Sequence, residues 1–85
     1  MMTQTIGRKL RQFRQKKGYS QETLADRAGL HPTYIGQVER GEKNITVETL
    51  AKITTALGIP ISSVFDDVLS NPMPSAENYP LRAYE

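Results

Sequence analysis

The chain contains no cysteine and a single histidine, His31. The absence of cysteine excludes disulfide bonds and thiolate metal ligands, and one histidine does not supply the usual ligands of a zinc site. We therefore expect no metal and no cofactor. No run of about 18 apolar residues is present that would cross a bilayer as a helix. Arg8 and Lys9 are not followed by an apolar segment, so we expect no secretory signal, no membrane partner and a cytoplasmic location.

A recognisable set of catalytic residues is also missing. Serine and threonine are present, but the only histidine lies beside the predicted third helix, and neither paired carboxylates nor a glycine-rich phosphate loop occurs. These are the parts from which an active site is assembled. We expect that the protein is not an enzyme.

The length of 85 residues fits one domain with one compact core, because a chain of this size buries only roughly 60% of its unfolded surface. Hydrophobic residues make up 38% of the chain and charged residues 24%, which is ordinary for a soluble domain. Six of the eleven basic residues fall between Arg8 and Lys17. This density is compatible with a binding surface for a polyanion, and equally with a solvated helix face.

Apolar residues recur at intervals of three and four, which predicts helices and no strands. The first helix is expected over residues 6–17, ended by Gly18. Ser20 is a suitable N-cap for a second helix that ends at Gly29. The residues expected to face inward in these two helices are Ile6, Leu10, Phe13, Leu24, Ala25 and Ala28.

A third helix is expected over residues 32–40, because proline is tolerated in a first turn, and Gly41 would end it. Thr46 is placed to cap a fourth helix, which Gly58 would end. The inward residues of these helices are expected to be Ile35, Val38, Val47, Leu50, Ile53 and Leu57.

A fifth helix is suggested by another set of apolar residues spaced at three and four. Its members are Ile61, Val64, Phe65, Val68 and Leu69. Three prolines then mark a change of composition in residues 71–85. We therefore expect an all-α fold, with a compact five-helix domain in residues 1–70 and a proline-containing C-terminal tail in residues 71–85.

Residues 20–40 follow the order helix, short turn, helix, which is the layout of a helix-turn-helix. This segment and its flanks resemble the signature of the Cro/C1-type (Xre) helix-turn-helix family of transcriptional regulators. The resemblance is carried by residues 18–25, 28–30, 34–41, 49–53 and 56–58 and by Phe65. It implies a lambda-repressor-like domain that binds double-stranded DNA. Residues 33–35 and 39–44 are also similar to the small controller proteins of restriction–modification systems.

The third helix carries the side chains that we expect to read bases. At about 100° per residue, Thr33, Gln37 and Arg40 lie on the side opposite to Ile35. Glutamine can pair with adenine, arginine can pair with guanine or a phosphate, and the threonine methyl can contact a thymine methyl. A solvated helix face is the alternative, and Arg40 could instead form a structural pair with Glu39.

Further residues are expected to contact the DNA backbone. Gln21 opens the second helix, where free N–H groups can hold a phosphate, and the resemblance implies a backbone contact there. Lys43 and Asn44 follow the third helix and can reach the backbone beside the groove. Tyr34 lies either beside the DNA or over the edge of the core.

The remaining candidates have weaker roles. Arg11, Arg14 and Lys17 could add to the positive surface or simply be solvated. His31 is expected to be a weak helix cap or a phosphate neighbour. Gly36 could allow a close approach to DNA or to a neighbour, although glycine costs about 1 kcal/mol against alanine inside a helix.

We expect a homodimer built on the fifth helix, because a peripheral helix of a small domain cannot easily bury the five apolar residues named above. A two-fold axis there would present two third helices to successive major grooves about 34–36 Å apart, which implies a pseudo-palindromic operator. The competing hypothesis is a helical adaptor with the same fold, in which Val64, Phe65, Val68 and Leu69 bind a protein partner.

Overall fold

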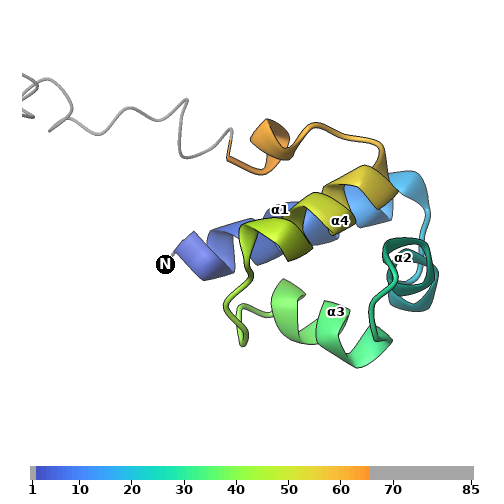
Figure 1. The fold of residues 1–85 in the computed structure, drawn as a ribbon, viewed down its shortest axis with the longest axis horizontal. Helices are drawn as coiled ribbons and strands as arrows, with labels where there is room; N and C mark the ends of the chain where they lie inside the picture. Colours follow the sequence, from blue (N-terminus) through green and yellow to red (C-terminus); the bar gives the residue numbers. More distant parts are fainter. Residues whose placement is uncertain (1, 66–85) are drawn as a thin grey trace, which may run out of the picture.

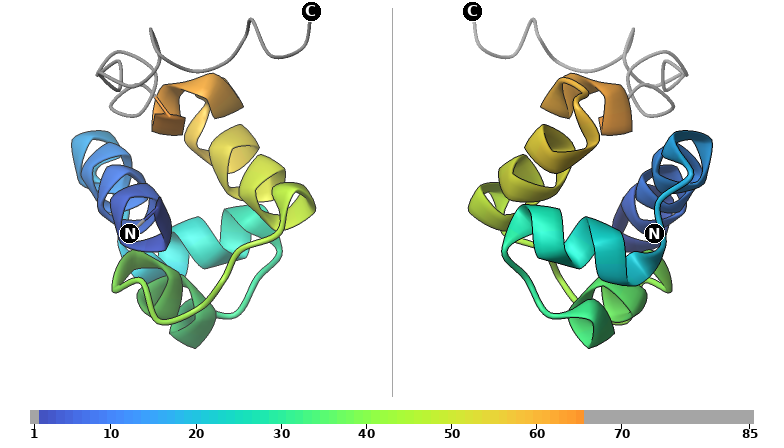
Figure 2. Two further views of the ribbon diagram at one scale, coloured as in Figure 1. Left: turned by 90° about the vertical axis from the view of Figure 1, so that its left-hand side faces the viewer. Right: turned by 90° about the vertical axis from the view of Figure 1, so that its right-hand side faces the viewer.

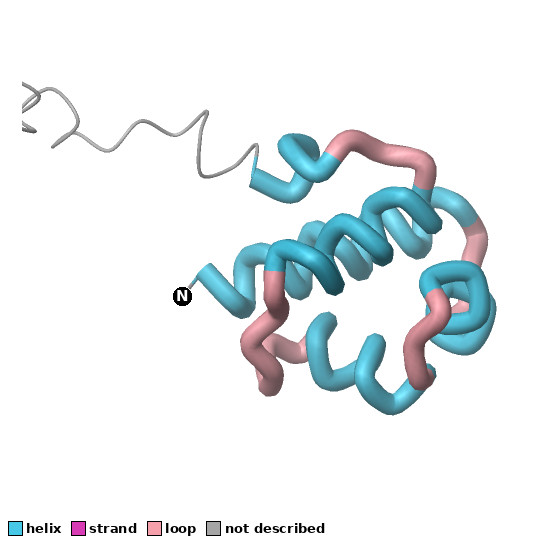
Figure 3. Tube along the Cα trace, in the orientation of Figure 1, coloured by secondary structure: helices cyan, strands magenta, loops and turns pink. Residues whose placement is uncertain are grey.

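The computed structural model describes residues 2–65 and shows an all-helical protein over this range (Figure 1). Its elements are α1 (Met2–Lys17), α2 (Gln21–Ala28), α3 (Pro32–Glu39), α4 (Val47–Leu57) and the 3-10 helix η1 (Ile61–Phe65). The described residues contain no strand (Figure 3), so the predicted all-α class is confirmed. None of these helices is both long enough and apolar enough to cross a bilayer.

The helices are arranged around one core, with two distinct ends. α1 and α4 lie on either side of the molecule, while α2 and α3 lie together below them (Figure 2). α3 packs against α1 and α2, and α2 also packs against α4. η1 contacts α1 and α4 at the end of the molecule opposite to α3. We refer below to the helix-turn-helix end, formed by α2 and α3, and to the η1 end.

The boundaries of α2 and α4 follow from their capping residues, as predicted. The hydroxyl oxygens of Ser20 and Thr46 each accept a hydrogen bond from the backbone N–H three residues later, at 2.9 and 3.1 Å. Gly29 and Gly58 end the same helices with φ angles of 70° and 72°. Glycine enters this left-handed region without the steric penalty that other residues meet.

α1 begins at Met2, earlier than the predicted start at residue 6. Its first turn contacts the loop that follows α3. Thr3 Oγ1 donates a 3.4 Å hydrogen bond to Asn44 Oδ1. Gln4 lies so close to Gly41 that a Cβ atom at position 41 would sit 2.6 Å from Gln4 Cγ. These tertiary contacts extend the helix beyond the apolar periodicity on which its predicted start was based.

The hydrophobic core draws on every helix. Its buried members are Ile6, Leu10, Leu24, Ala25, Ala28, Ile35, Val38, Leu50, Ile53, Leu57 and Val64. Phe13, predicted to face inward, is half-buried at the edge of this core. The prediction for Val47 is wrong, because its side chain is 75% exposed. Val47 is the first residue of α4, and Ile45 in the preceding loop packs against the core instead.

The described part of the predicted fifth helix is a 3-10 helix. Residues 61–65 form the 3-10 helix η1, and Val64 within it is fully buried. Ile61 and Phe65 are half-buried and pack against the core. Val64 is therefore a core residue and is not available to a dimer interface, because α1 and α4 enclose η1 on its inner side. Val68 and Leu69 lie outside the described residues, as does the predicted tail.

Candidate nucleic-acid interface

The connection between α2 and α3 is short and fixed at both ends. It comprises residues 29–31, and Leu30 in its centre packs against the core. His31 caps α3, because its Nδ1 accepts a 3.1 Å hydrogen bond from the backbone N–H of Thr33. Pro32 occupies the first position of the helix, where a backbone N–H would have no partner within the helix, so proline loses no hydrogen bond there. His31 therefore has the capping role that was one of the two expected for it.

α3 separates buried and exposed side chains as its periodicity predicts. Ile35 and Val38 are 1% and 2% exposed and face the core. Thr33 and Arg40 are exposed, and Gln37 is half-buried. We call the side carrying Thr33, Gln37 and Arg40 the outer side of α3. Its polar side chains are accessible at the helix-turn-helix end.

Tyr34 lies at the border between the two sides of α3. Its side chain is half-buried and packs against the hydrophobic core. The ring therefore covers the core edge, which was one of the two alternatives for this residue. Its partial exposure still leaves part of the side chain accessible at the surface.

A buried ion pair joins α1 to the inner side of α3. Arg14 donates from Nε to Glu39 Oε2 at 2.6 Å and from Nη2 to Glu39 Oε1 at 3.1 Å. The third guanidinium nitrogen donates to the backbone carbonyl of Tyr19 at 2.8 Å. The side chains of Arg14 and Glu39 are only 11% and 3% exposed. Such a two-bond pair fixes both distance and orientation between the helices.

The same carboxylate also holds the first residue of α2. Gln21 Nε2 donates a 3.0 Å hydrogen bond to Glu39 Oε1. One N–H of the Gln21 amide is committed in this way, while the amide has a second N–H and a carbonyl oxygen. Glu39 thus positions the Gln21 side chain at the junction of α1, α2 and α3.

The structure excludes the alternative pairing of Arg40 with Glu39 and gives Arg14 neither of the two roles considered for it. Glu39 pairs with Arg14 and not with Arg40, because α1 crosses the end of α3 and brings Arg14 to the carboxylate. Arg14 therefore belongs to a buried structural pair and does not add to the positive surface. Arg40 instead pairs with Glu42.

The pair of Arg40 and Glu42 is open to solvent. Arg40 Nε donates to Glu42 Oε2 at 2.8 Å, and Nη2 donates to Oε1 at 3.2 Å. The two side chains are 57% and 52% exposed. The hydrogen bonds from Arg40, together with its charge, hold the pKa of the Glu42 carboxyl below its ordinary value. The carboxylate in turn raises the pKa of Arg40, so both groups are charged at neutral pH.

Gly36 lies under the side chains of Gln21 and Arg40. A Cβ atom at position 36 would sit 3.1 Å from Arg40 Nη1 and 3.5 Å from Gln21 Oε1. The missing side chain therefore leaves room over α3 for the Gln21 amide and the Arg40 guanidinium group. Gly36 serves this packing in the protein itself, which gives a physical reason for a glycine inside a helix.

A hollow opens where α2 and α3 begin. Its lining residues are Arg14, Ser20, Gln21, Glu22, Pro32 and Thr33. The first turn of a helix exposes unpaired backbone N–H groups, which favour anions such as phosphate. Gln21 and Thr33 therefore line one concave surface.

The loop after α3 and the exposed face of α1 carry other candidates. Lys43 and Asn44 are exposed, and Asn44 accepts the hydrogen bond from Thr3 described above. Arg11 is exposed on α1. Lys17 is exposed too, but a Cβ atom built at Gly58 would lie 3.6 Å from its Nζ. This places the ammonium group near the C-terminal end of α4, whose dipole favours a cation.

The basic residues of α1 do not form one surface. Lys9 and Lys16 have their ammonium groups 5.8 and 5.9 Å from the ring centre of Phe13. Arg14 points into the junction with α3, and Lys17 extends toward α4. The dense run of cations in the sequence is thus divided among different faces of the helix.

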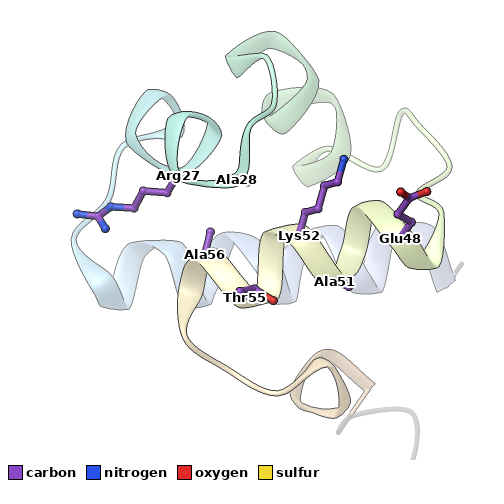
Figure 4. Close-up of a pocket in the computed structure, with 7 residues that line it drawn as sticks. All are labelled: Arg27, Ala28, Glu48, Ala51, Lys52, Thr55 and Ala56. Carbon is purple, nitrogen blue, oxygen red and sulfur yellow. The ribbon is translucent and has the colours of Figure 1, made fainter.

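A second hollow lies between α2 and α4 and was not anticipated from the sequence. Arg27 and Ala28 of α2 line it together with residues of α4, namely Glu48, Ala51, Lys52, Thr55 and Ala56 (Figure 4). Arg27 also stacks on Tyr19, with its guanidinium carbon 4.8 Å from the ring centre. Charged groups of both signs border this hollow, so its charge alone does not select a ligand.

Comparison with known proteins identifies relatives that share the fold. The helix-turn-helix family (HTH_3) matches residues 10–64. The control protein C.BamHI of Bacillus amyloliquefaciens is 43% identical over 62 residues, which cover 72% of this chain and 76% of that protein.

Solved structures give the same result. The restriction-modification controller protein C.AhdI from Aeromonas hydrophila has a TM-score of 0.73 and 43% identity, covering 74% of this chain and 96% of that one. The C.Esp1396I controller tetramer, solved in complex with its natural 35 base-pair operator, has a TM-score of 0.75 and 27% identity. That match covers 82% of this chain and 92% of the other.

Proposed function

Since the chain belongs to the helix-turn-helix family (HTH_3), we propose that it is a transcriptional regulator that binds double-stranded DNA sequence-specifically as a homodimer. The observation that carries the proposal is the outer side of α3, where Thr33, Gln37 and Arg40 project from a helix with a buried inner side. The adaptor hypothesis is not favoured, because this surface is polar and the relatives are control proteins. The likeness to C.BamHI and C.AhdI supports a role as controller of a restriction–modification system.

Base reading is assigned to the outer side of α3. The major groove of B-DNA is about 12 Å wide and admits one α-helix. In that position Gln37 can pair with an adenine, and the Thr33 methyl group can contact a thymine methyl. Arg40 can reach a guanine or a phosphate once it separates from Glu42.

Backbone binding is assigned to residues that flank α3. Gln21 and the free N–H groups at the start of α2 can hold one phosphate at the hollow described above. Lys43 and Asn44 can contact the backbone on the other side of the groove, and the exposed part of Tyr34 can lie beside a sugar. These contacts position α3 and carry no sequence information themselves.

The homodimer is assigned to the η1 end. Ile61 and Phe65 are half-buried there, and Val68 and Leu69 continue the apolar spacing outside the described residues. Because the η1 end lies opposite α3, a two-fold axis there leaves both copies of α3 free for DNA. We assign residues 1–70 to the DNA-binding domain and residues 71–85 to a tail, and we place the protein with its DNA in the cytoplasm.

The dimer assignment predicts that Val68→Asp yields monomers, because a charge would enter an apolar interface. Operator affinity should then fall steeply, since one copy holds only a half-site, while the helical content stays unchanged. Sedimentation equilibrium and circular dichroism measure these two properties. An unmodified protein that is monomeric at tens of micromolar, or a variant that still dimerises, would place the interface elsewhere.

Selection of binding sites from random duplex DNA tests the function directly. We expect enrichment of a pseudo-palindromic sequence whose half-sites lie one helical turn apart, about 34–36 Å. Affinity should also fall steeply between about 50 and 200 mM salt, because several phosphate contacts release counterions. A protein that enriches no sequence and shows no salt dependence would support the adaptor hypothesis.

A further inference from the structure

The exposed pair of Arg40 and Glu42 sits at the edge of the proposed interface. Both carboxylate oxygens of Glu42 are engaged, one by Arg40 Nε and the other by Arg40 Nη2. We propose that Glu42 occupies one phosphate-binding edge of Arg40, that of Nε and Nη2, in the free protein and thereby limits sequence-independent binding to DNA. This inference rests on the proposed function and adds a determinant of affinity to it.

Carboxylate and phosphate groups compete for the same donors on arginine. The planar guanidinium binds either anion through two parallel N–H bonds along one edge. In this protein that edge is taken by Glu42 at 2.8 and 3.2 Å. A DNA phosphate must therefore displace Glu42 before it can bind Arg40 through Nε and Nη2.

The position of Arg40 makes this competition relevant to DNA. Its Nη1 atom lies over Gly36, where a Cβ would be only 3.1 Å away, and the Gln21 amide reaches the same place. Lys43 and Asn44 follow Glu42 directly in the chain. The paired Arg40 thus lies near Gln21 in space and shortly before Lys43 and Asn44 in the chain.

The pair is weak enough to open when DNA arrives. With side chains 57% and 52% exposed, water screens the attraction, and exposed ion pairs of this kind contribute little to stability. The pair of Arg14 and Glu39 differs, because its burial prevents a phosphate from replacing the carboxylate. Only Arg40, of these two arginines, can exchange its partner for DNA.

Glu42 should affect the affinity for random-sequence DNA only through contacts between the protein and phosphates. Sequence-independent binding comes almost entirely from cations that neutralise phosphates. Masking Arg40 removes one such cation from the free protein, whereas the base contacts assigned to Thr33 and Gln37 do not involve Glu42. The carboxylate therefore keeps the regulator from binding tightly to any duplex it meets.

The test compares Glu42→Gln with Glu48→Gln, using a random-sequence duplex and fluorescence anisotropy. Both substitutions remove one exposed negative charge, but Glu48 lies at the start of α4 beside the α2–α4 hollow. We expect E42Q to bind more tightly than E48Q and its slope of log affinity against log salt to steepen by about 0.9, the value of one phosphate contact. The ratio of the affinity of E42Q to that of E48Q should therefore fall by about three- to fourfold between about 50 and 200 mM salt.

Arg40→Gln completes the experiment, alone and combined with E42Q. The gain from E42Q should largely disappear in the R40Q background, because the released cation is then missing. A gain that persists without Arg40, or one equal to that of E48Q, would show only general charge repulsion and overturn the inference. Circular dichroism of each variant verifies that helical content is retained.

The same data separate this inference from the proposed function. If the unmodified protein binds no duplex under any salt condition, the proposed function fails. If it binds DNA with a steep salt dependence while E42Q behaves as E48Q does, only the role of Glu42 fails.

Discussion

On its inner side α3 is joined to α1 by the buried pair of Glu39 and Arg14, whereas on its outer side Arg40 pairs with Glu42 in contact with water. Both pairs use two guanidinium–carboxylate hydrogen bonds of similar length. The two glutamates are separated by only two residues, Arg40 and Gly41. Their surroundings differ because α1 covers one carboxylate and nothing described covers the other.

The difference shows how burial decides what an ion pair does. Removing one member of a buried pair leaves an uncompensated charge, which is costly. The inner pair, with Gln21 bound to the same carboxylate, therefore fixes the positions of α1, α2 and α3 relative to one another. The outer pair is screened by water and can exchange partners. The inner side of α3 therefore supports the fold, and the outer side is free to bind.

The largest expected effect is the loss of the inner pair through Glu39→Ala. Arg14 would then lie buried without its carboxylate, and Gln21 would lose its anchor. We expect the free energy of unfolding to fall by about 3–5 kcal/mol, as for other broken buried pairs. Urea denaturation followed by circular dichroism measures this change.

Glu42→Ala is the matched control for that variant. Its carboxylate is exposed, so we expect no resolvable change in the free energy of unfolding. Equal destabilisation by E39A and E42A would contradict the assignment of different roles to the two sides.

A smaller loss of stability is expected when a glycine that packs against the inner side of α3 is replaced by alanine. At Gly7, where α1 meets α3, a Cβ would lie 2.3 Å from the carbonyl oxygen of Val38 and 2.8 Å from that of Glu39. Gly7→Ala should therefore force the helices apart and destabilise the protein by about 1–3 kcal/mol. Thermal and urea denaturation measure this loss.

Gly36→Ala is the comparison for Gly7→Ala. The nearest atom to its Cβ is the end of the flexible Arg40 side chain, which can move, and alanine is favoured over glycine inside a helix by about 1 kcal/mol. We expect unchanged or increased stability. Destabilisation of G36A as large as that of G7A would show that the outer side is packed as rigidly as the inner side.

The smallest effect is expected from Thr33→Ala on the outer side. Thr33 is exposed, and the bond that caps α3 uses its backbone N–H, which alanine retains. The free energy of unfolding should stay within about 0.5 kcal/mol of the unmodified value. A larger loss would mean that the outer side also contributes to folding.

Most of the fold could be predicted from the sequence because its signals are local. Ser20, Thr46, Gly29 and Gly58 mark helix ends through bonds to nearby backbone groups, and the structure has the helices end there. Val47 was misplaced because periodicity does not reveal that the first residue of a helix can extend past the core. Apolar spacing predicts a fifth helix but does not distinguish a 3-10 helix from an α-helix, and residues 61–65 form the 3-10 helix η1.

In the candidate site, too, some features could be predicted from local sequence and others could not. The outward direction of Thr33 and Gln37 follows from helical geometry and one inward residue, Ile35. The partner of Glu39 could not be predicted, because Arg14 lies 25 residues away in sequence and meets it only through the crossing of α1 over α3. Gly7 gave no signal either, since its close approach to Val38 is a property of helix packing.

The proposed function requires that the outer side of α3 read the DNA sequence. Gln37→Ala tests it most directly, by fluorescence anisotropy on the selected operator and on a random duplex of equal length at the same salt concentration. The variant should lose about 1–3 kcal/mol of binding free energy on the operator, with relaxed preference at one base pair, and bind the random duplex as the unmodified protein does. Equal weakening on both duplexes would contradict direct reading by this helix.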